Sequence, residues 1–155
     1  MDTDTTAWEQ TPQILFEAIV HRAQDYYSEG RLDRSRELLE KAIKIRPGHG
    51  PSWYLLGVIH RREERLPSAL ICLQRAADID PSDRGALVNL GESLILAGKV
   101  PEGVALLRAL FEDGRDPHLP PAEQDSITRR AGAQLAILAS LLPPDVSDIS
   151  DKKQS

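Results

Sequence analysis

Apolar and small side chains recur along this chain at a fixed interval of 34 residues. The recurring positions are Ala42 and Ala76, Leu56 and Leu90, Pro47 and Pro81, and the series Leu39, Leu73 and Leu107. Such self-similarity is typical of repeat proteins, in which each unit buries its apolar face against its neighbours. Between these positions the apolar residues follow helical spacing, so we expect two helices in each period.

Small residues mark the places where the two helices of a period approach each other closely. Three pairs fall in register: Ala23 with Ser35, Gly57 with Ala69, and Gly91 with Gly103. Large apolar residues on the second helices fill the space between neighbouring pairs. Proline ends the second helix of the first two periods, because it has no backbone N–H to continue the hydrogen-bond ladder.

The pattern predicts an all-α protein of three helix-turn-helix repeats and a C-terminal capping helix. The repeats cover residues 16–49, 50–83 and 84–117 within a domain of residues 11–142. The expected helices are 11–28, 32–45, 51–62, 67–79, 84–97 and 101–112, with a capping helix over 122–142. Thr11 is the expected N-cap, followed by Pro12 in the first turn. We expect residues 1–10 to be a flexible N-terminus and residues 143–155 a disordered tail.

The period and its residue types resemble the tetratricopeptide repeat (TPR) family, whose fold is a right-handed helical solenoid. The second repeat carries the family's residue types at eight positions: Trp53, Leu56, Gly57, His60, Ala69, Leu73, Ala76 and Pro81. The third repeat departs from the pattern at Leu110, where a small residue is usual, and at Arg115, where proline is usual. The resemblance covers about 100 residues and implies a protein that binds another polypeptide.

Charge and composition exclude several other classes of protein. The net charge is −5 and no basic stripe is present, which disfavours binding to nucleic acid or to an anionic membrane. No stretch approaches the roughly 18 apolar residues that cross a bilayer. The N-terminus lacks the apolar run of a signal peptide, so we expect a cytoplasmic protein.

The sequence offers no constellation of catalytic or metal-binding residues. The single cysteine, Cys72, lies among apolar neighbours and is expected to be a core residue. The histidines lack the spacing of zinc ligands. We expect His60 to pack on its helix and His49 to be solvated in a turn. The charge runs around Arg129 and Arg130 are interpreted as solvated faces. We therefore expect neither an enzyme nor a bound cofactor or metal.

The resemblance also implies a binding surface, because in TPR proteins the first helix of each pair lines a concave groove. The corresponding residues here are Glu17, Val20, Gln24, Tyr27, Tyr54, Val58, Arg61, Val88, Glu92 and Ile95. Heat-shock co-chaperones of the family carry Lys and Asn in this groove and clamp a C-terminal carboxylate. No such clamp is visible here, and Glu92 would repel a carboxylate. For Val58 and Val88, packing between adjacent helices is an equally good interpretation.

Size, repeat number and an apolar groove resemble the translocator chaperones of bacterial type III secretion. These proteins hold an extended segment of a secretion substrate, and this is the expected function. The alternative is an assembly scaffold that binds a folded subunit through its convex face or capping helix, with Arg129 and Arg130 in the contact. The first helix also has an apolar face (Trp8, Ile14, Leu15 and Ile19) that fits either the stack or a second copy in a homodimer.

Overall fold

The regular secondary structure of the described part of the chain is entirely helical. The computed structural model describes the backbone of residues 7–141 and the side chains from Pro12 onward. Its elements are α1 (Ala7–Ser28), α2 (Leu32–Ile45), α3 (Gly50–Arg62), α4 (Leu66–Ile79), α5 (Arg84–Leu96), α6 (Val100–Gly114), the 3-10 helix η1 (Pro121–Glu123) and α7 (Ser126–Leu141). The chain divides into two compact units, one ending at Asp83 and the other beginning at Arg84. The all-α prediction is confirmed.

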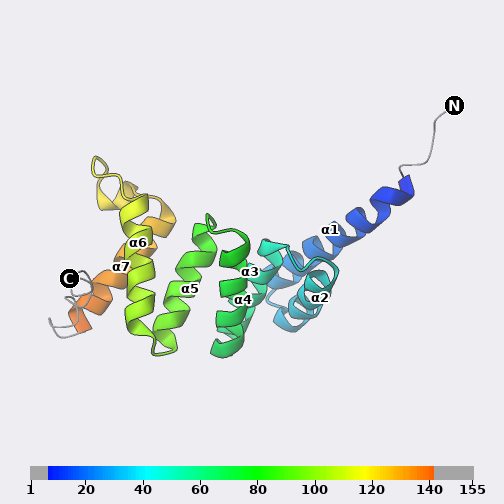
Figure 1. The fold of residues 1–155 in the computed structure, drawn as a ribbon, viewed down its shortest axis with the longest axis horizontal. Coiled ribbons are helices and arrows are strands. Elements are labelled where there is room, and N and C mark those ends of the chain that lie inside the picture. The colour runs from blue at the N-terminus through cyan, green and yellow to red at the C-terminus, as the bar shows by residue number, and fades with distance from the viewer. Residues whose placement is uncertain (1–6, 142–155) are drawn as a thin grey trace, which may run out of the picture. The chain divides into compact units, whose positions relative to one another are not determined.

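The first unit consists of two antiparallel helix pairs, α1 with α2 and α3 with α4 (Figure 1). Helix α2 also packs against α3, which joins the two pairs. The buried core that they share contains Ala23, Leu39, Leu56, Ile59 and Cys72. Burying these side chains is the main source of stability for the unit, since a fully buried Leu or Ile contributes about 1.5–3 kcal/mol.

Backbone approach within each pair depends on the small residues that the sequence places there. Ser35 is fully buried, and its Oγ donates a 2.7 Å hydrogen bond to the carbonyl oxygen of Ala23. A Cβ on Gly57 would lie 2.7 Å from Cγ of Leu73, too close for any real side chain. Substitution at either position would push the two helices apart.

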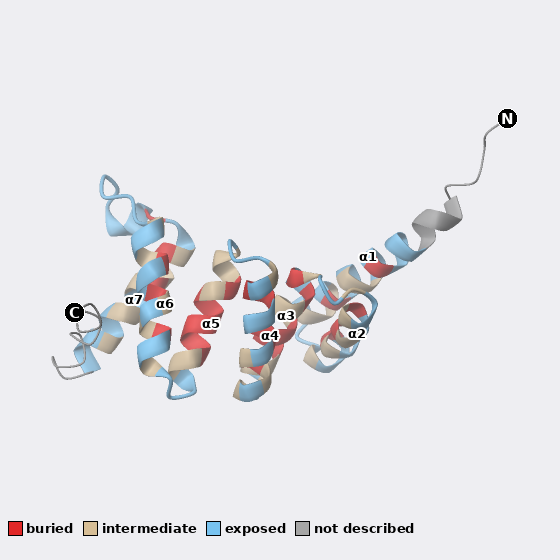
Figure 2. Ribbon diagram, viewed as in Figure 1, coloured by how far each residue is buried: buried red, intermediate tan, exposed pale blue. Residues whose placement is uncertain are grey.

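The second unit contains α5, α6 and α7 around a core of Val88, Leu107, Leu110 and Ala131. Figure 2 shows α5 as the most thoroughly buried helix of this unit. Helices α5 and α6 meet at two glycines, because a Cβ on Gly103 would lie 2.6 Å from the carbonyl oxygen of Gly91. Leu110 replaces the small residue that TPRs usually carry, and it packs into the core beneath α7.

A partly buried guanidinium connects the three helices of the second unit. Arg84, at the start of α5, donates to the carbonyl oxygen of Leu110 in α6 at 3.1 Å. It also donates to Oγ1 of Thr128 at 2.9 Å and to the Asp125 carboxylate at 3.2 Å, both at the start of α7. One charged side chain thus fixes where α7 begins against the other two helices.

Three predicted helix ends differ from the structure by two residues or more, each for a local reason. Helix α1 begins at Ala7 rather than Thr11, so Pro12 lies inside the helix. Helix α6 runs to Gly114 rather than 112, because no proline stands at position 115 to end it. Helix α7 begins at Ser126 rather than 122, and the preceding residues form η1.

Several expectations for the termini lie outside the described residues. These are the disorder of residues 143–155, the flexibility of residues 1–6 and the packing of the Trp8 side chain. Residues 7–10, expected to be flexible, form the first turn of α1. On the same helix, Ile14 and Leu15 are 60% and 58% exposed, so they do not pack on the first unit.

The same left-handed turn ends the first helix of each pair. Gly30 and Gly98 have φ of 75° and 81°, and Glu64 occupies the equivalent position with φ of 60°. Each turn is closed by a backbone hydrogen bond from the following residue, such as that from Arg65 to the carbonyl oxygen of His60 at 2.8 Å. This is the Schellman geometry, which glycine adopts without a steric penalty.

We therefore expect Glu64→Gly to raise the free energy of unfolding by about 1 kcal/mol, since an L-residue pays roughly that much in the left-handed region. Gly98→Ala should lower it by a similar amount. The control is Gly48→Ala, because Gly48 has no neighbour within 4 Å and no positive φ. Urea denaturation of the four proteins measures these differences, and a loss of stability in Glu64→Gly would contradict the assignment.

Asp125 caps the N-terminus of α7. Its Oδ1 accepts hydrogen bonds from the backbone N–H groups of Ile127 and Thr128 at 2.9 and 3.1 Å. The Thr128 hydroxyl, these N–H groups and Arg84 together hold the pKa of the Asp125 carboxyl well below its usual range. Asp125 therefore favours the folded state in its ionised form.

We expect Asp125→Ala to lower the free energy of unfolding by about 1 kcal/mol at pH 7, as loss of an N-cap does. The pKa of Asp125 is lower in the folded state than in the unfolded one. Its contribution is therefore complete above the unfolded pKa of about 4 and is lost as the pH falls further. Denaturation at several pH values tests this, with the exposed Asp113→Ala as control. A difference that persists unchanged at pH 2 would show that Asp125 acts without its charge.

Candidate functional site

The predicted groove residues of the first unit lie on α1 and α3. On α1, Gln24 is exposed while Val20 and Tyr27 are half-buried. On α3, Tyr54 and Arg61 are half-buried and Val58 is buried, with 9% of its surface exposed. Val58 therefore belongs to the packed interior, as in the interpretation that it packs between adjacent helices. Of the six predicted residues, Val20, Gln24 and Tyr54 combine accessible surface with a chemistry suited to a peptide.

Tyr27 has a structural role that the sequence did not indicate. Its ring packs against the core cluster of the first unit. The guanidinium carbon of Arg62, at the end of α3, lies 5.2 Å from the centre of the ring. This cation–π contact joins the first helices of the two pairs. Tyr27 therefore helps to build the surface, and removing its side chain would disturb the fold as well as any binding.

The predicted groove residues of the second unit do not form an open surface. Val88 is 1% exposed and packs with Leu107, Leu110 and Ala131, so its assignment to the groove is wrong. Ile95 is half-buried and packs against the same core.

Glu92 is 8% exposed and is bound by Arg130 of α7. Nε of Arg130 lies 2.6 Å from Oε1 of Glu92, and Nη2 contacts Oε2. The same Nη2 donates to Oδ1 of Asn89 at 3.2 Å. The expectation that Glu92 repels a carboxylate is wrong, because the guanidinium neutralises its charge. The interpretation of Arg130 as part of a solvated face is also wrong, whereas Arg129 is exposed.

His49, His60 and Cys72 are partly or fully buried in the helical structure. His49 was expected to be solvated, but it is half-buried and caps α3: Nδ1 accepts from the Ser52 backbone N–H at 3.3 Å. Burial lowers the pKa of His49 and that of His60. Burial also raises the pKa of the Cys72 thiol to about 11, which leaves it protonated and unreactive at neutral pH.

The described residues show no arrangement for metal binding or membrane insertion. Among the side chains that the structure describes, from residue 12 to residue 141, no three or more of His, Cys, Asp or Glu come together in a way that would hold a metal ion. None of the helices found in that range is both long and apolar enough to cross a membrane.

The profile of the tetratricopeptide repeat family matches residues 21–84, from within α1 to the start of α5. This part of the chain consists of tetratricopeptide repeats. The TPR fold inferred from the 34-residue period is confirmed, and the matched residues include the whole of α2, α3 and α4.

Two solved structures share the TPR fold over most of the chain. The translocator chaperone SycD of Yersinia enterocolitica type III secretion has a TM-score of 0.75 and 13% identity, covering 88% of this chain and 91% of SycD. SycD has also been solved in complex with a peptide of the translocator YopD. The first TPR domain of Spaghetti (RPAP3), bound to an HSP90 peptide SRMEEVD, has a TM-score of 0.68 and 13% identity, covering 81% of this chain and 91% of that domain.

Longer TPR proteins match at the level of sequence. Peroxisome biogenesis protein 5 of Arabidopsis thaliana is 25% identical over 145 residues, which is 91% of this chain and 20% of that protein. The chloroplastic protein PYG7 of the same organism is 28% identical over 79 residues, or 51% of this chain and 26% of that protein. The chain spans about a quarter or less of the length of these curated relatives.

The Glu92–Arg130 pair makes a testable contribution to the second unit. We expect Arg130→Met to lower the free energy of unfolding by about 2 kcal/mol, because it removes the guanidinium that pairs with the buried Glu92 carboxylate. The double variant Glu92→Gln, Arg130→Met should recover part of this loss. Arg129→Met is the matched control, since Arg129 is exposed, and its effect should stay within about 0.5 kcal/mol. Equal effects of the two single arginine variants would contradict a special role for the pair.

Proposed function

We propose that this chain is a protein–protein interaction module that binds an extended segment of another polypeptide on the α1 and α3 faces of its first unit. The observation that carries the proposal is the chemistry of that surface. Val20 and Tyr54 offer apolar and aromatic area, and Gln24 offers an amide donor and acceptor. An extended peptide recognised through one or two apolar anchors fits such a surface.

We further propose that the bound polypeptide is a secreted or membrane-inserting protein, held by a cytosolic chaperone of the type III translocator kind. The likeness to SycD supports this assignment through fold and size, since the match covers most of both chains. At 13% identity that likeness concerns the fold alone, so the class of partner rests on the apolar character of the surface. In this proposal the chain performs no catalysis and needs no cofactor.

The chemistry of the surface also favours internal peptide segments over free C-termini. The clamp positions of the first unit hold Val20, Gln24, Tyr54 and the buried Val58, none of which is cationic. At these four positions a carboxylate would lose its hydration without a cationic side chain to pair with. This separates the proposed function from that of TPR domains that bind the C-terminus of a heat-shock protein.

The proposal predicts that Tyr54→Ala with Gln24→Ala weakens capture of the natural partner at least tenfold while the protein keeps its helical content, measured by circular dichroism. Affinity purification from the native cells, with mass spectrometry of bound proteins, identifies the partner, and titration with its segment gives the affinity. Tyr27 is unsuitable for this test because its ring belongs to the core. The matched control is Lys41→Ala with Arg75→Ala, two exposed residues on the second helices α2 and α4.

A peptide comparison tests the absence of a carboxylate clamp in the same experiment. The peptide SRMEEVD is titrated with a free and with an amidated C-terminus. We expect no difference between the two forms. Retention of the same partners by the Tyr54 and Gln24 variant would contradict binding on the α1 and α3 faces. It would favour a scaffold that binds its partner through another face.

A further inference from the structure

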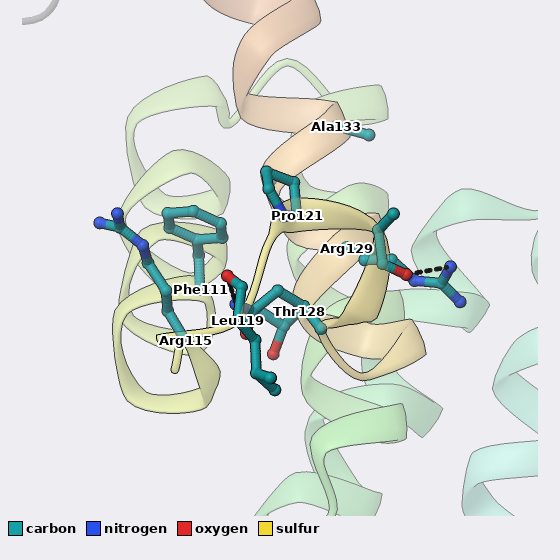
Figure 3. Close-up of a pocket in the computed structure, with 10 residues that line it drawn as sticks. Phe111, Arg115, Leu119, Pro121, Thr128, Arg129 and Ala133 are labelled. Carbon is teal, nitrogen blue, oxygen red and sulfur yellow. Dashed lines mark hydrogen bonds between the residues drawn. The ribbon is translucent and has the colours of Figure 1, made fainter. Parts of the chain in front are cut away.

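The second unit contains an apolar groove that the proposed function does not use. It has a volume of about 540 Å³ and lies between the end of α6, the loop of residues 115–125 and the first half of α7 (Figure 3). Its apolar walls come from Phe111, Leu119, Pro121 and Ala133. Leu119 is 41% exposed, so its side chain is accessible to a ligand in the groove.

Hydrogen bonds from a buried glutamine hold the loop wall of the groove. Gln124 is 8% exposed. Its Nε2 donates to the carbonyl oxygens of Asp116 and Leu119 at 2.6 and 2.9 Å. Its Oε1 accepts from the backbone N–H of Asp116 at 2.9 Å. These bonds fix both ends of the loop segment that carries Leu119, so the wall is formed before any ligand arrives.

A glycine on α7 sets the depth of the groove. A Cβ on Gly132 would lie 2.8 Å from Cε2 of Phe111, so only glycine lets the aromatic ring approach the helix backbone. The ring is half-buried and is one of the residues that line the groove. Ala133, the next residue on α7, is exposed and leaves the opposite side open.

Two guanidinium groups lie on either side of this apolar surface, and within the described residues neither has an acidic partner. Figure 3 shows Arg115 beside Phe111 and Arg129 on the far side of Leu119 and Pro121. Arg115 lies over the Phe111 ring at 5.9 Å, and Arg129 donates one hydrogen bond to the carbonyl oxygen of Ala122 at 3.3 Å. Within the described residues neither of them forms an ion pair with an acidic side chain.

The other two arginines that connect helices of this unit are paired, Arg84 with Asp125 and Arg130 with Glu92. The positive charge beside the groove is therefore available to a ligand, in a chain whose net charge is −5. Guanidinium groups bind carboxylates through paired hydrogen bonds.

We propose that this groove binds an acidic segment of a partner protein. An apolar side chain of the segment lies between Phe111, Leu119 and Ala133, and acidic residues on either side of it pair with Arg115 and Arg129. The apolar contact supplies most of the affinity, and the two ion pairs set the orientation and the preference for acidic sequences. This site is separate from the α1 and α3 surface and does not depend on the function proposed for it.

The test uses the full chain and a fluorescent peptide, GDLFLDG with blocked ends, titrated by fluorescence anisotropy. We expect binding that weakens with added salt and is at least tenfold weaker to Arg115→Glu with Arg129→Glu. The matched charge control is Arg75→Glu with Arg108→Glu, two exposed arginines outside the groove, which should bind as the wild type does. The amide peptide GNLFLNG should also bind at least tenfold more weakly.

A second pair of variants tests the apolar part of the site. Ala133→Leu places a larger side chain in the groove from an exposed helix position, and it should abolish binding without unfolding the protein. Ala136→Leu makes the same change on α7 outside the groove and should have no effect. The Tyr54 and Gln24 variant should bind the peptide normally, so failure of the function proposed for the first unit would not affect this result.

Three outcomes would overturn the proposal. The first is the absence of binding by the wild type, and the second is binding that survives both Ala133→Leu and the charge reversal. The third is binding that appears only after residues 142–155 are removed. This last result would show that the chain's own acidic segment around Asp145 and Asp148 occupies the groove in place of a partner.

Discussion

The close approach of paired helix backbones is the constraint on which the rest of this structure depends. Gly57 lies against Leu73, Gly91 lies against Gly103, and the Ser35 hydroxyl bonds directly to the carbonyl oxygen of Ala23. At such distances a single added Cβ forces the helices apart. Because each pair is closed in this way, its first helix keeps a fixed face for other contacts. The binding face proposed for the first unit lies on α1 and α3, whose positions follow from two of these contacts.

The repeating part of the fold could be predicted well from the sequence, because each inference made in one period can be checked against the next period. A helix end inferred in one period recurs 34 residues later, and α2 runs over the expected residues 32–45. The errors lie where no second copy supports the inference. Thr11 and Pro12 have the residue types of a helix start, yet α1 passes through them. Helix α7 lies beyond the last repeat, and its true cap, Asp125, could have been found from the spacing of Asp125 and Thr128 alone.

The candidate site was predicted less completely, because position in a repeat does not determine exposure. Val20, Gln24 and Tyr54 keep accessible surface on the first unit. Val88 and Glu92 occupy equivalent positions in the third repeat, but the non-repeating helix α7 packs against that part of α5 and Arg130 binds Glu92. A buried glutamate needs a cationic partner. The sequence contained that partner in Arg129-Arg130 but gave no means of telling which of the two arginines faces inward.

The two surfaces identified here differ in physical character, and this difference allows their contributions to a partner's affinity to be separated. The α1 and α3 face of the first unit offers aromatic, aliphatic and amide groups, so binding there depends on apolar burial and changes little with ionic strength. The groove of the second unit adds two exposed guanidinium groups whose attraction to carboxylates is screened over about 8 Å at physiological salt. An affinity that falls as salt is added, and loses that dependence on charge reversal at Arg115 and Arg129, would therefore come from the groove. An affinity insensitive to salt would come from the α1 and α3 face. The salt dependence thus assigns the bound segment to one unit without a structure of the complex.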